Sequence, residues 1–355
     1  MTHHPYIDEA LSRHVLTVGE YFQDRVHGGI AAVLRSYQAC FADFRFIPSS
    51  RSRSFAHKLR YDLGGLFRLF HRLLWDRDIR IVHIHTAAGR SFPKHLLYAR
   101  LARLTGRKTV LHCHASRFQV WYEGLSEGRR RRVREEMGRL DRLVCLSEAW
   151  KTYFVSIGMP EEKVCVLRNI TPEPPAGLPM RETAPLRLLF LGEIGPRKGV
   201  FDLLEAMKGI PEGVRLDIGG NRMEAELRTA IRDGGLDDRV FFHGFVSGEQ
   251  KRDLLARAHV FVLPSHNEGL PISILEAMSY GCAIISTPVG GIPEVVGENG
   301  VLVPPGDVEA IRSAILSMLP EGVSGRMGAL SREKVKPYYP GAVMDELKRL
   351  YRALL

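Results

Sequence analysis

Two glutamates, Glu268 and Glu276, are separated by seven residues in the stretch NEGLPISILEAMSYGCAIISTPVGGIPE. Carboxylates accept hydrogen bonds, so a pair of them can hold the hydroxyl groups of a sugar or a ribose. The two acids alone leave a second interpretation open. Glu268 can serve as a capping or dipole partner of the following helix, and Glu276 can be an exposed helix residue.

The surrounding residues predict the elements that position these acids. Residues 258–263 form a short apolar run typical of a buried strand, and Pro, Ser, Asn and Gly then break it. Pro271 suits the first turn of a helix, Gly281 suits its C-terminal end, and residues 283–286 predict another strand. In open parallel sheets, ligands bind beyond the carboxyl ends of strands, where helix N-termini favour phosphate. The stretch therefore predicts a site for sugar hydroxyls and phosphates.

Length and composition indicate a globular protein of two domains. The chain has 355 residues, of which 45% are apolar and 25% are charged. No run approaches the roughly 18 apolar residues of a membrane span, and the N-terminus lacks the apolar core of a signal peptide, so we expect a cytoplasmic location. The five cysteines lack metal-ligand spacing, and His83 and His85 alternate with apolar residues, which favours core packing over metal binding.

The positive charge lies in the first half of the chain. Residues 1–178 contain 29 Lys and Arg against 17 Asp and Glu, while residues 179–355 contain 21 against 23. The first half should therefore face an anionic lipid, a phosphorylated acceptor or nucleic acid. The arginine run at 129–132 lacks an aromatic or glycine-rich RNA motif, which disfavours nucleic acid. Residues 54–76 predict either a sheet-packing helix with a solvated basic face or a membrane-surface helix, interrupted at Gly64 and Gly65.

Strands and helices alternate twice along the chain, which predicts an α/β fold with two parallel sheets. The first alternation spans residues 1–169 and the second spans residues 186–336. Between them, residues 170–185 contain five prolines and read as a semi-rigid linker. Residues 337–355 predict a terminal amphipathic helix.

The stretch that holds Glu268 and Glu276 resembles the donor-site signature of the retaining family-4 glycosyltransferases, which have the GT-B fold. The resemblance implies two Rossmann-like parallel-sheet domains that face each other across a cleft, with the terminal helix crossing back to the first domain. It implies transfer of a sugar from a nucleotide-sugar donor, with a UDP-sugar favoured, to a hydroxyl of a glycan or lipid-linked acceptor. It implies no cofactor and no metal, and a role in polysaccharide or glycoconjugate biosynthesis.

The resemblance also implies roles for residues of the opening stretch. It assigns Glu276 to the ribose hydroxyls of the donor. It assigns Glu268 to the sugar hydroxyls and the reacting face, with the backbone of Gly269 and Leu270 beside it. Fold does not determine function, so a sugar-nucleotide epimerase, a phosphorylase or a non-catalytic sugar-nucleotide-binding protein remains an alternative.

A second segment, GEIGPRKGV, places Arg197 and Lys198 before a predicted helix, where cations and free N–H groups suit a diphosphate, although two basic residues at such a place can also be plain surface charges. The resemblance places a diphosphate-binding lysine at Lys198. The family often has an arginine directly after the first glycine of this segment, and this chain has Glu193 there. Arg197 or Arg222 can substitute as the second cation, and we rank Arg197 first.

The remaining family positions lie at strand ends. His114 ends a predicted strand and is expected to face the donor sugar. Gly28 and Gly29 match a glycine-rich turn at the donor phosphates or the acceptor, and Gly244 and Phe245 match the turn that lines the nucleotide base. Peripheral attachment of the basic first half to the inner face of the plasma membrane is a further expectation.

Overall fold

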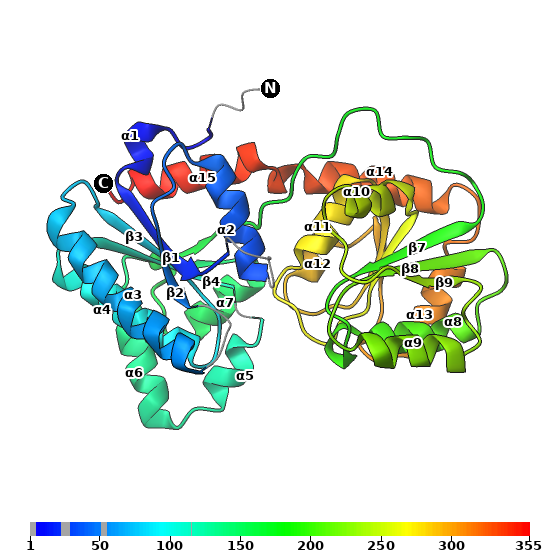
Figure 1. Ribbon diagram of the computed structural model, residues 1–355, viewed down its shortest axis with the longest axis horizontal. Helices are drawn as coiled ribbons and strands as arrows, with labels where there is room; N and C mark the ends of the chain where they lie inside the picture. Colours follow the sequence, from blue (N-terminus) through cyan, green and yellow to red (C-terminus); the bar gives the residue numbers. More distant parts are fainter. Residues whose placement is uncertain (1–4, 23–28, 51–54, 115) are drawn as a thin grey trace. The chain divides into compact units, whose positions relative to one another are not determined.

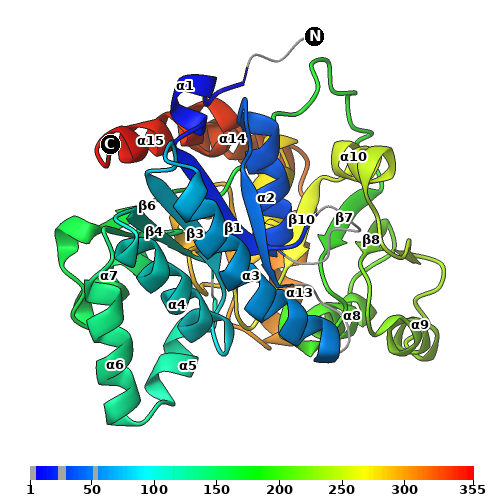
Figure 2. The same ribbon diagram turned by 60° about the vertical axis from the view of Figure 1, so that its left-hand side comes forward.

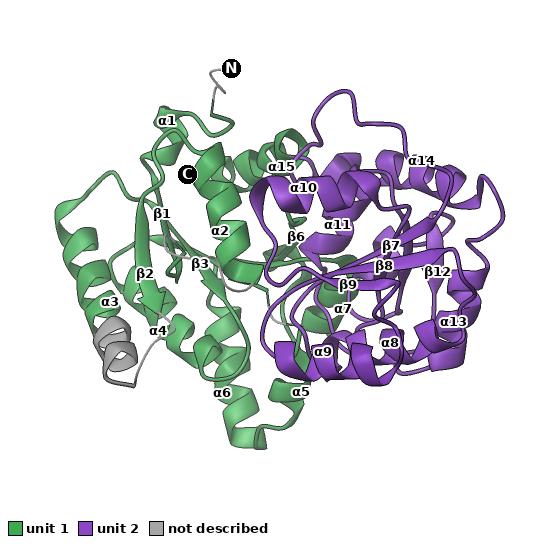
Figure 3. Cartoon of the chain, turned by 45° about the vertical axis from the view of Figure 1, so that its right-hand side comes forward, with its two compact units in different colours: residues 1–170, 340–355 green, residues 171–339 purple. Residues whose placement is uncertain are grey.

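The chain folds into two compact units. The computed structural model describes residues 5–22, 29–50, 55–114 and 116–355, with side chains in the third range from Gly64 onward. The first unit contains residues 1–170 and 340–355, and the second contains residues 171–339 (Figure 3). The terminal segment therefore packs with the first unit rather than with the unit that precedes it in the chain.

The first unit is built on a six-stranded parallel sheet in the order β2-β1-β3-β4-β5-β6. Its elements are α1 (Glu9–Ser12), β1 (Val15–Glu20), α2 (Gly29–Cys40), β2 (Phe46–Ser50), α3 (Phe55–Trp75), β3 (Ile81–Thr86), α4 (Ser91–Leu104), β4 (Lys108–Cys113), α5 (Phe118–Glu123), α6 (Glu127–Gly138), β5 (Arg142–Cys145), α7 (Glu148–Ser156), the 3₁₀ turn η1 (Glu161–Lys163), β6 (Val164–Val166) and α15 (Pro340–Arg352).

The two faces of this sheet are chemically different. Val82 and Ile84 of β3 pack in the apolar core with residues of α3 and α4, which Figure 2 shows in front of the sheet. Because side chains alternate along a strand, His83 and His85 point to the opposite face. There they contact Tyr37 of α2, and His83 also contacts Tyr351 of α15. The predicted burial of these histidines in the core is confirmed, since both are at most 1% exposed.

The second unit repeats the architecture with the sheet order β12-β11-β10-β7-β8-β9, again all parallel. Its elements are β7 (Leu186–Leu191), η2 (Pro196–Lys198), α8 (Val200–Lys208), β8 (Val214–Gly219), α9 (Glu224–Asp233), β9 (Val240–Phe242), α10 (Gly248–Arg257), β10 (Val260–Leu263), α11 (Ile272–Ser279), β11 (Ala283–Ser286), α12 (Ile292–Val295), β12 (Gly300–Leu302), α13 (Val308–Leu316), α14 (Val323–Val335) and η3 (Lys336–Tyr338).

Helices cover both faces of the second sheet. Figure 1 shows α8, α9 and α13 on one face and α10, α11 and α14 on the other. The strands between them are fully buried in β10 and β11, as their uninterrupted apolar runs predict. The predicted α/β class with two parallel sheets is confirmed. Strand β7 lies directly beside β10, so the loops that follow these two strands meet at one edge of the sheet.

Two predictions about glycines had different outcomes. Gly281 follows α11 with a φ of 74°, the left-handed conformation expected of a residue that ends a helix. The predicted interruption at Gly64 and Gly65 is wrong, because α3 runs unbroken from Phe55 to Trp75. A side chain at position 65 would collide with the hydroxyl of Tyr98 of α4 and lie tightly against the carbonyl of Pro48. Gly65 therefore permits close packing of α3 instead of ending the helix.

The terminal helix α15 is tied to the first unit by polar contacts. Glu346 forms an ion pair with Arg168 at 2.6 Å, and the hydroxyl of Tyr351 lies 2.6 Å from Nδ1 of His83. Val343, Met344 and Leu347 are fully buried. Apolar burial and these two contacts together hold the helix in place.

Candidate functional site

A buried ion pair joins Lys198 to Glu268 at the edge of the second sheet. Lys198 ends η2 after β7, Glu268 lies in the loop after β10, and the ammonium contacts Oε1 of the carboxylate. The two side chains are only 14% and 8% exposed. Ser265 donates a second hydrogen bond to the same carboxylate oxygen at 2.8 Å. Charges this deeply buried need partners, so each group holds the other in a defined position.

Close backbone contacts hold the loops around this pair. Gly199 has a φ of 69°, and a side chain there would collide with the carbonyl of Pro264. Gly290 has a φ of 59°, and a side chain there would strike the carbonyls of Glu268 and Gly269. The Gly291 amide donates to the Gly269 carbonyl at 2.6 Å. Only glycine tolerates both the left-handed conformation and the close approach, so these positions determine where Glu268 sits.

Glu276 forms a second, more open ion pair. It occupies the second turn of α11, and its Oε1 lies 2.6 Å from Nζ of Lys251 on α10. The glutamate side chain is 13% exposed and the lysine is 31% exposed. The interpretation of Glu276 as an exposed helix residue is therefore wrong. Leu270, between the two glutamates, is also buried.

Glu193 lies between two arginines. Its Oε2 is 3.7 Å from Nη2 of Arg197 and 3.4 Å from Nε of Arg222. Arg197 also donates to the carbonyl of Asn267, next to Glu268, at 3.2 Å. Arg222 is the more exposed of the two at 69%, and its φ of 94° is unusual for a residue with a side chain. The acid thus brings two cations together near the Lys198 loop.

The predicted base-lining turn is accessible. Gly244 has a φ of 69°, and its carbonyl accepts a hydrogen bond from the Gly220 amide at 2.8 Å. Phe245 is 53% exposed. An exposed aromatic ring beside a backbone turn can stack against a planar base, and the role that the resemblance implies for this turn stays a prediction.

His114 lies at the carboxyl end of β4 in the first unit, where the sequence places it. Its Nε2 is 2.9 Å from Nδ1 of His85, and its ring stacks on His112 with centroids 4.1 Å apart. Burial lowers the pKa of His114 to about 3, so the imidazole is neutral near pH 7. A neutral ring can donate or accept a hydrogen bond but does not supply positive charge to a phosphate.

The other predicted residues of the first unit are glycines. Gly29 begins α2, and a side chain there would meet open space. Gly28 lies outside the described residues. The two units are separate bodies, so the predicted approach of His114 to Glu268 across a cleft stays a prediction.

Ser265, Lys251 and Gly290 belong to the second-unit site, but the sequence did not single them out. Lys251 is 25 residues before its partner Glu276, and no spacing rule connects residues so far apart. Gly290 lies inside the motif and Ser265 lies two residues before it, and Thr287 donates to the Ser265 carbonyl at 2.6 Å. For Ser265 and Gly290, the only sequence signal was that a small residue lies in a loop expected to bind a ligand.

Comparisons with known proteins match most of the chain to two family models. Residues 11–169 match the glycosyl transferase 4-like domain, and residues 185–321 match the glycosyl transferases group 1. Their boundary falls in the proline-rich segment that the sequence marks as a linker.

Curated relatives share about a third of their residues with this chain over the matched part. The amylovoran biosynthesis glycosyltransferase AmsK of Erwinia amylovora is 35% identical over 195 residues, which are 51% of this chain and 47% of that protein. The putative colanic acid biosynthesis glycosyltransferase WcaL of Escherichia coli K12 is 32% identical over 61% of this chain and 57% of that protein. The chain thus spans about half the length of these relatives.

Solved structures share the fold across almost the full chain. A sucrose-phosphate synthase from Thermosynechococcus elongatus superimposes with a TM-score of 0.74 at 20% identity, covering 96% of this chain and 99% of that one. Anabaena Alr3699/HepE in complex with UDP and glucose gives 0.72 at 16% identity, covering 96% and 100%. At such low identity the likeness establishes the fold alone, and it confirms the expected GT-B class.

Proposed function

We propose that the chain is a glycosyltransferase, as its matches to the glycosyl transferases group 1 and to the glycosyl transferase 4-like domain suggest, and that it transfers a sugar from a nucleotide-sugar donor to a hydroxyl of a glycan or lipid-linked acceptor. Its setting is polysaccharide or glycoconjugate biosynthesis, as the names of AmsK and WcaL suggest. The transfer retains the configuration of the donor sugar and uses no metal. The second unit binds the donor, and the first binds the acceptor.

The buried pair of Lys198 and Glu268 carries this proposal. The two groups neutralise each other while no donor is bound, and both have few alternative partners because they are almost inaccessible to water. A donor diphosphate offers the lysine a stronger anionic partner, and sugar hydroxyls offer the carboxylate hydrogen-bond donors. Donor binding would therefore exchange one ion pair for two sets of ligand contacts.

The chemical step explains why a cation belongs at this position. As the bond between the sugar and the diphosphate breaks, negative charge grows on the departing phosphate oxygen. Lys198 is the best-placed cation to stabilise that charge, and Arg197 adds a second one near the Asn267 carbonyl. Glu193 lies between Arg197 and Arg222, and we rank Arg197 first because it also contacts the loop that holds Glu268.

A UDP-sugar is the donor we favour, since Anabaena Alr3699/HepE, which shares the fold, was solved with UDP and glucose. Thermal-shift screening against UDP-, GDP- and ADP-sugars tests the base, because a ligand that binds only the folded protein raises Tm. Transfer is then assayed with the stabilising donor and glycan or lipid-linked acceptors. Anomeric analysis of the product tests retention, and an assay with and without added Mg²⁺ or Mn²⁺ tests metal independence.

The same assay separates the alternatives. A donor that rearranges without any acceptor would indicate an epimerase, and consumption that requires inorganic phosphate would indicate a phosphorylase. Binding without turnover of any donor would indicate a non-catalytic protein. Each of these outcomes contradicts the proposed transfer.

The first unit carries an exposed surface suited to an anionic membrane. Phe67, Phe70, Leu74 and Trp75 of α3 are between 43% and 77% exposed, and Leu104 at the end of α4 is 76% exposed. A groove at the same place is lined by leucines, including Leu74 and Leu104, and by basic residues. The others of these lining residues are Leu73, Arg77, Arg80, Arg107, Lys108, Leu354 and Leu355. Aromatic and cationic side chains together favour the interface of anionic lipid. We infer that the protein binds the inner face of the plasma membrane there.

No helix among the described residues is both long enough and apolar enough to cross a membrane.

We predict that the protein floats with vesicles of anionic phospholipid at low salt and less so at high salt, because screening weakens surface charge interactions. The double variant Trp75→Ala, Leu104→Ala should bind several-fold more weakly. Leu319→Ala, an exposed leucine of the second unit at 41%, is the matched control and should bind normally. Absence of flotation at low salt would remove the membrane proposal without affecting the assay for transfer.

A further inference from the structure

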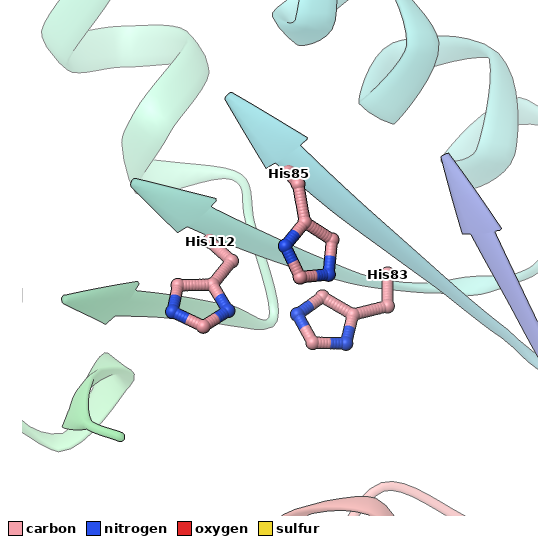
Figure 4. A group of neighbouring side chains, drawn as sticks. All are labelled: His83, His85 and His112. Carbon is pink, nitrogen blue, oxygen red and sulfur yellow. The ribbon is translucent and has the colours of Figure 1, made fainter. Parts of the chain in front are cut away.

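Three histidines form a cluster on the α2 and α15 face of the first sheet. His83 and His85 lie two residues apart on β3, so their side chains share one face. His112 on β4 is the direct cross-strand partner of His85. Figure 4 shows the three rings turned toward one another. Each ring contributes a nitrogen to a set whose members all lie within 4.8 Å of one another.

Four of the six ring nitrogens of this cluster lack a partner among the described residues. All three residues are at most 1% exposed. Nε2 of His83, Nε2 of His85 and both nitrogens of His112 are buried without a hydrogen bond among the described residues. Buried polar atoms are nearly always paired, because a lost partner is costly away from water. So many orphaned nitrogens at one place indicate that another species completes the cluster.

In two of the three rings, the Nδ1 atom has a hydrogen-bond partner. Nδ1 of His83 is 2.6 Å from the Tyr351 hydroxyl, and Nδ1 of His85 is 2.9 Å from Nε2 of His114. Histidines that bind metals through one nitrogen almost always donate the other N–H to an acceptor, which sets the tautomer and the ring orientation. With Nδ1–H as the donor in both contacts, the tautomer that the proposal requires, the lone pair on Nε2 is left for a ligand.

From this geometry we propose that His83, His85 and His112 bind a divalent metal ion of the zinc class, which ties β3 to β4 beneath α2 and α15. Three neutral imidazoles suit Zn²⁺ and similar transition metals rather than Ca²⁺ or Mg²⁺. Zn–N bonds of about 2.0–2.1 Å in a tetrahedral site set the nitrogens about 3.3 Å apart. The ring of His83 lies roughly parallel to those of His85 and His112, with centroids 4.5 and 5.4 Å apart, so the rings must turn for their lone pairs to converge on the ion.

A fourth ligand is available at the same place. The ring of Tyr37 on α2 lies 5.2 Å from that of His85, and its buried hydroxyl has no partner among the described residues. Either this oxygen or a hydroxide completes four-fold coordination and supplies the negative charge that the histidines lack. This metal is separate from the proposed sugar transfer, for which we expect none.

Metal titration of the full-length protein tests the proposal. After dialysis against EDTA, the wild type should bind one equivalent of Zn²⁺ and show a rise in Tm. Co²⁺ should give the visible absorption of a four-coordinate site. A wild type that binds neither ion would overturn the proposal and would leave buried water as the species that completes the cluster. This result needs no variant.

Variants then locate the ion. His83→Gln and His112→Gln should each abolish the Co²⁺ spectrum. Tyr351→Phe should keep the spectrum and weaken affinity by about 10- to 100-fold, the usual effect of losing a hydrogen bond behind a metal ligand. His95→Gln is the matched control, since His95 is buried in the same unit but bonds to Ser49 and Thr86. A spectrum that survives in both His83→Gln and His112→Gln would also overturn the proposal.

Discussion

Replacing Glu268 with glutamine is expected to lower kcat by about 100-fold or more, the scale of losing one contact made in the transition state. The substitution keeps the shape of the side chain and removes its charge. Ser265 can still donate to the amide oxygen, so the loop should keep its position. What is lost is an anionic acceptor at the donor-sugar hydroxyls and the charge that holds the Lys198 ammonium in place.

Steady-state kinetics with the donor identified by thermal shift measures this effect. Glu276→Gln is the informative comparison, because Glu276 also pairs with a lysine but is assigned to the ribose. We expect that variant to raise KM for the donor more than it lowers kcat, since ribose contacts are made in the ground state and the transition state alike. Glu205→Gln removes one half of an exposed ion pair with Lys208, and we expect this control variant to keep the wild-type kcat and KM. Near-normal kcat in Glu268→Gln would exclude the assigned role.

Replacing Lys198 with alanine should also lower kcat by about 100-fold or more, because the departing diphosphate loses its best-placed cation. This variant carries a stability cost as well. It leaves the Glu268 carboxylate buried without its partner, and breaking a buried pair in this way costs about 3–5 kcal/mol of unfolding free energy. Lys208→Ala, at the far end of α8 and half exposed, controls for the loss of a lysine near the same helix.

The double variant Lys198→Ala, Glu268→Gln separates the two effects. With the charge of position 268 removed, no unpaired carboxylate remains, so the free energy of unfolding should recover most of what Lys198→Ala alone lost. Turnover should stay low, because the diphosphate still lacks its cation. Chemical denaturation measures the first quantity and the transfer assay the second. Recovery of both the free energy of unfolding and the turnover would mean that Lys198 is purely structural.

The fold was predictable from local pattern because each signal needed only neighbouring residues. Uninterrupted apolar runs predict strands buried on both faces, as in β10 and β11. The left-handed conformation of Gly281 follows from its place after a helical run. Alternation of strands and helices predicts parallel sheets, and the long motif around Glu268 and Glu276 predicted the family. At Gly65 the same local reasoning failed, because the close packing of Tyr98 from another helix decides that position.

Contacts between distant segments were decided by tertiary structure alone. Lys198 and Glu268 are 70 residues apart, and they meet because β7 lies beside β10 in the sheet. Likewise, alternation placed His83 and His85 on one face, but only the register of β3 against β4 put His112 beside them. Sequence spacing records which way a side chain points within its own strand or helix. It does not record strand order or register, because both depend on how the faces of whole elements pack together. Strand order and register decided which charged groups form ion pairs and which imidazole rings are neighbours.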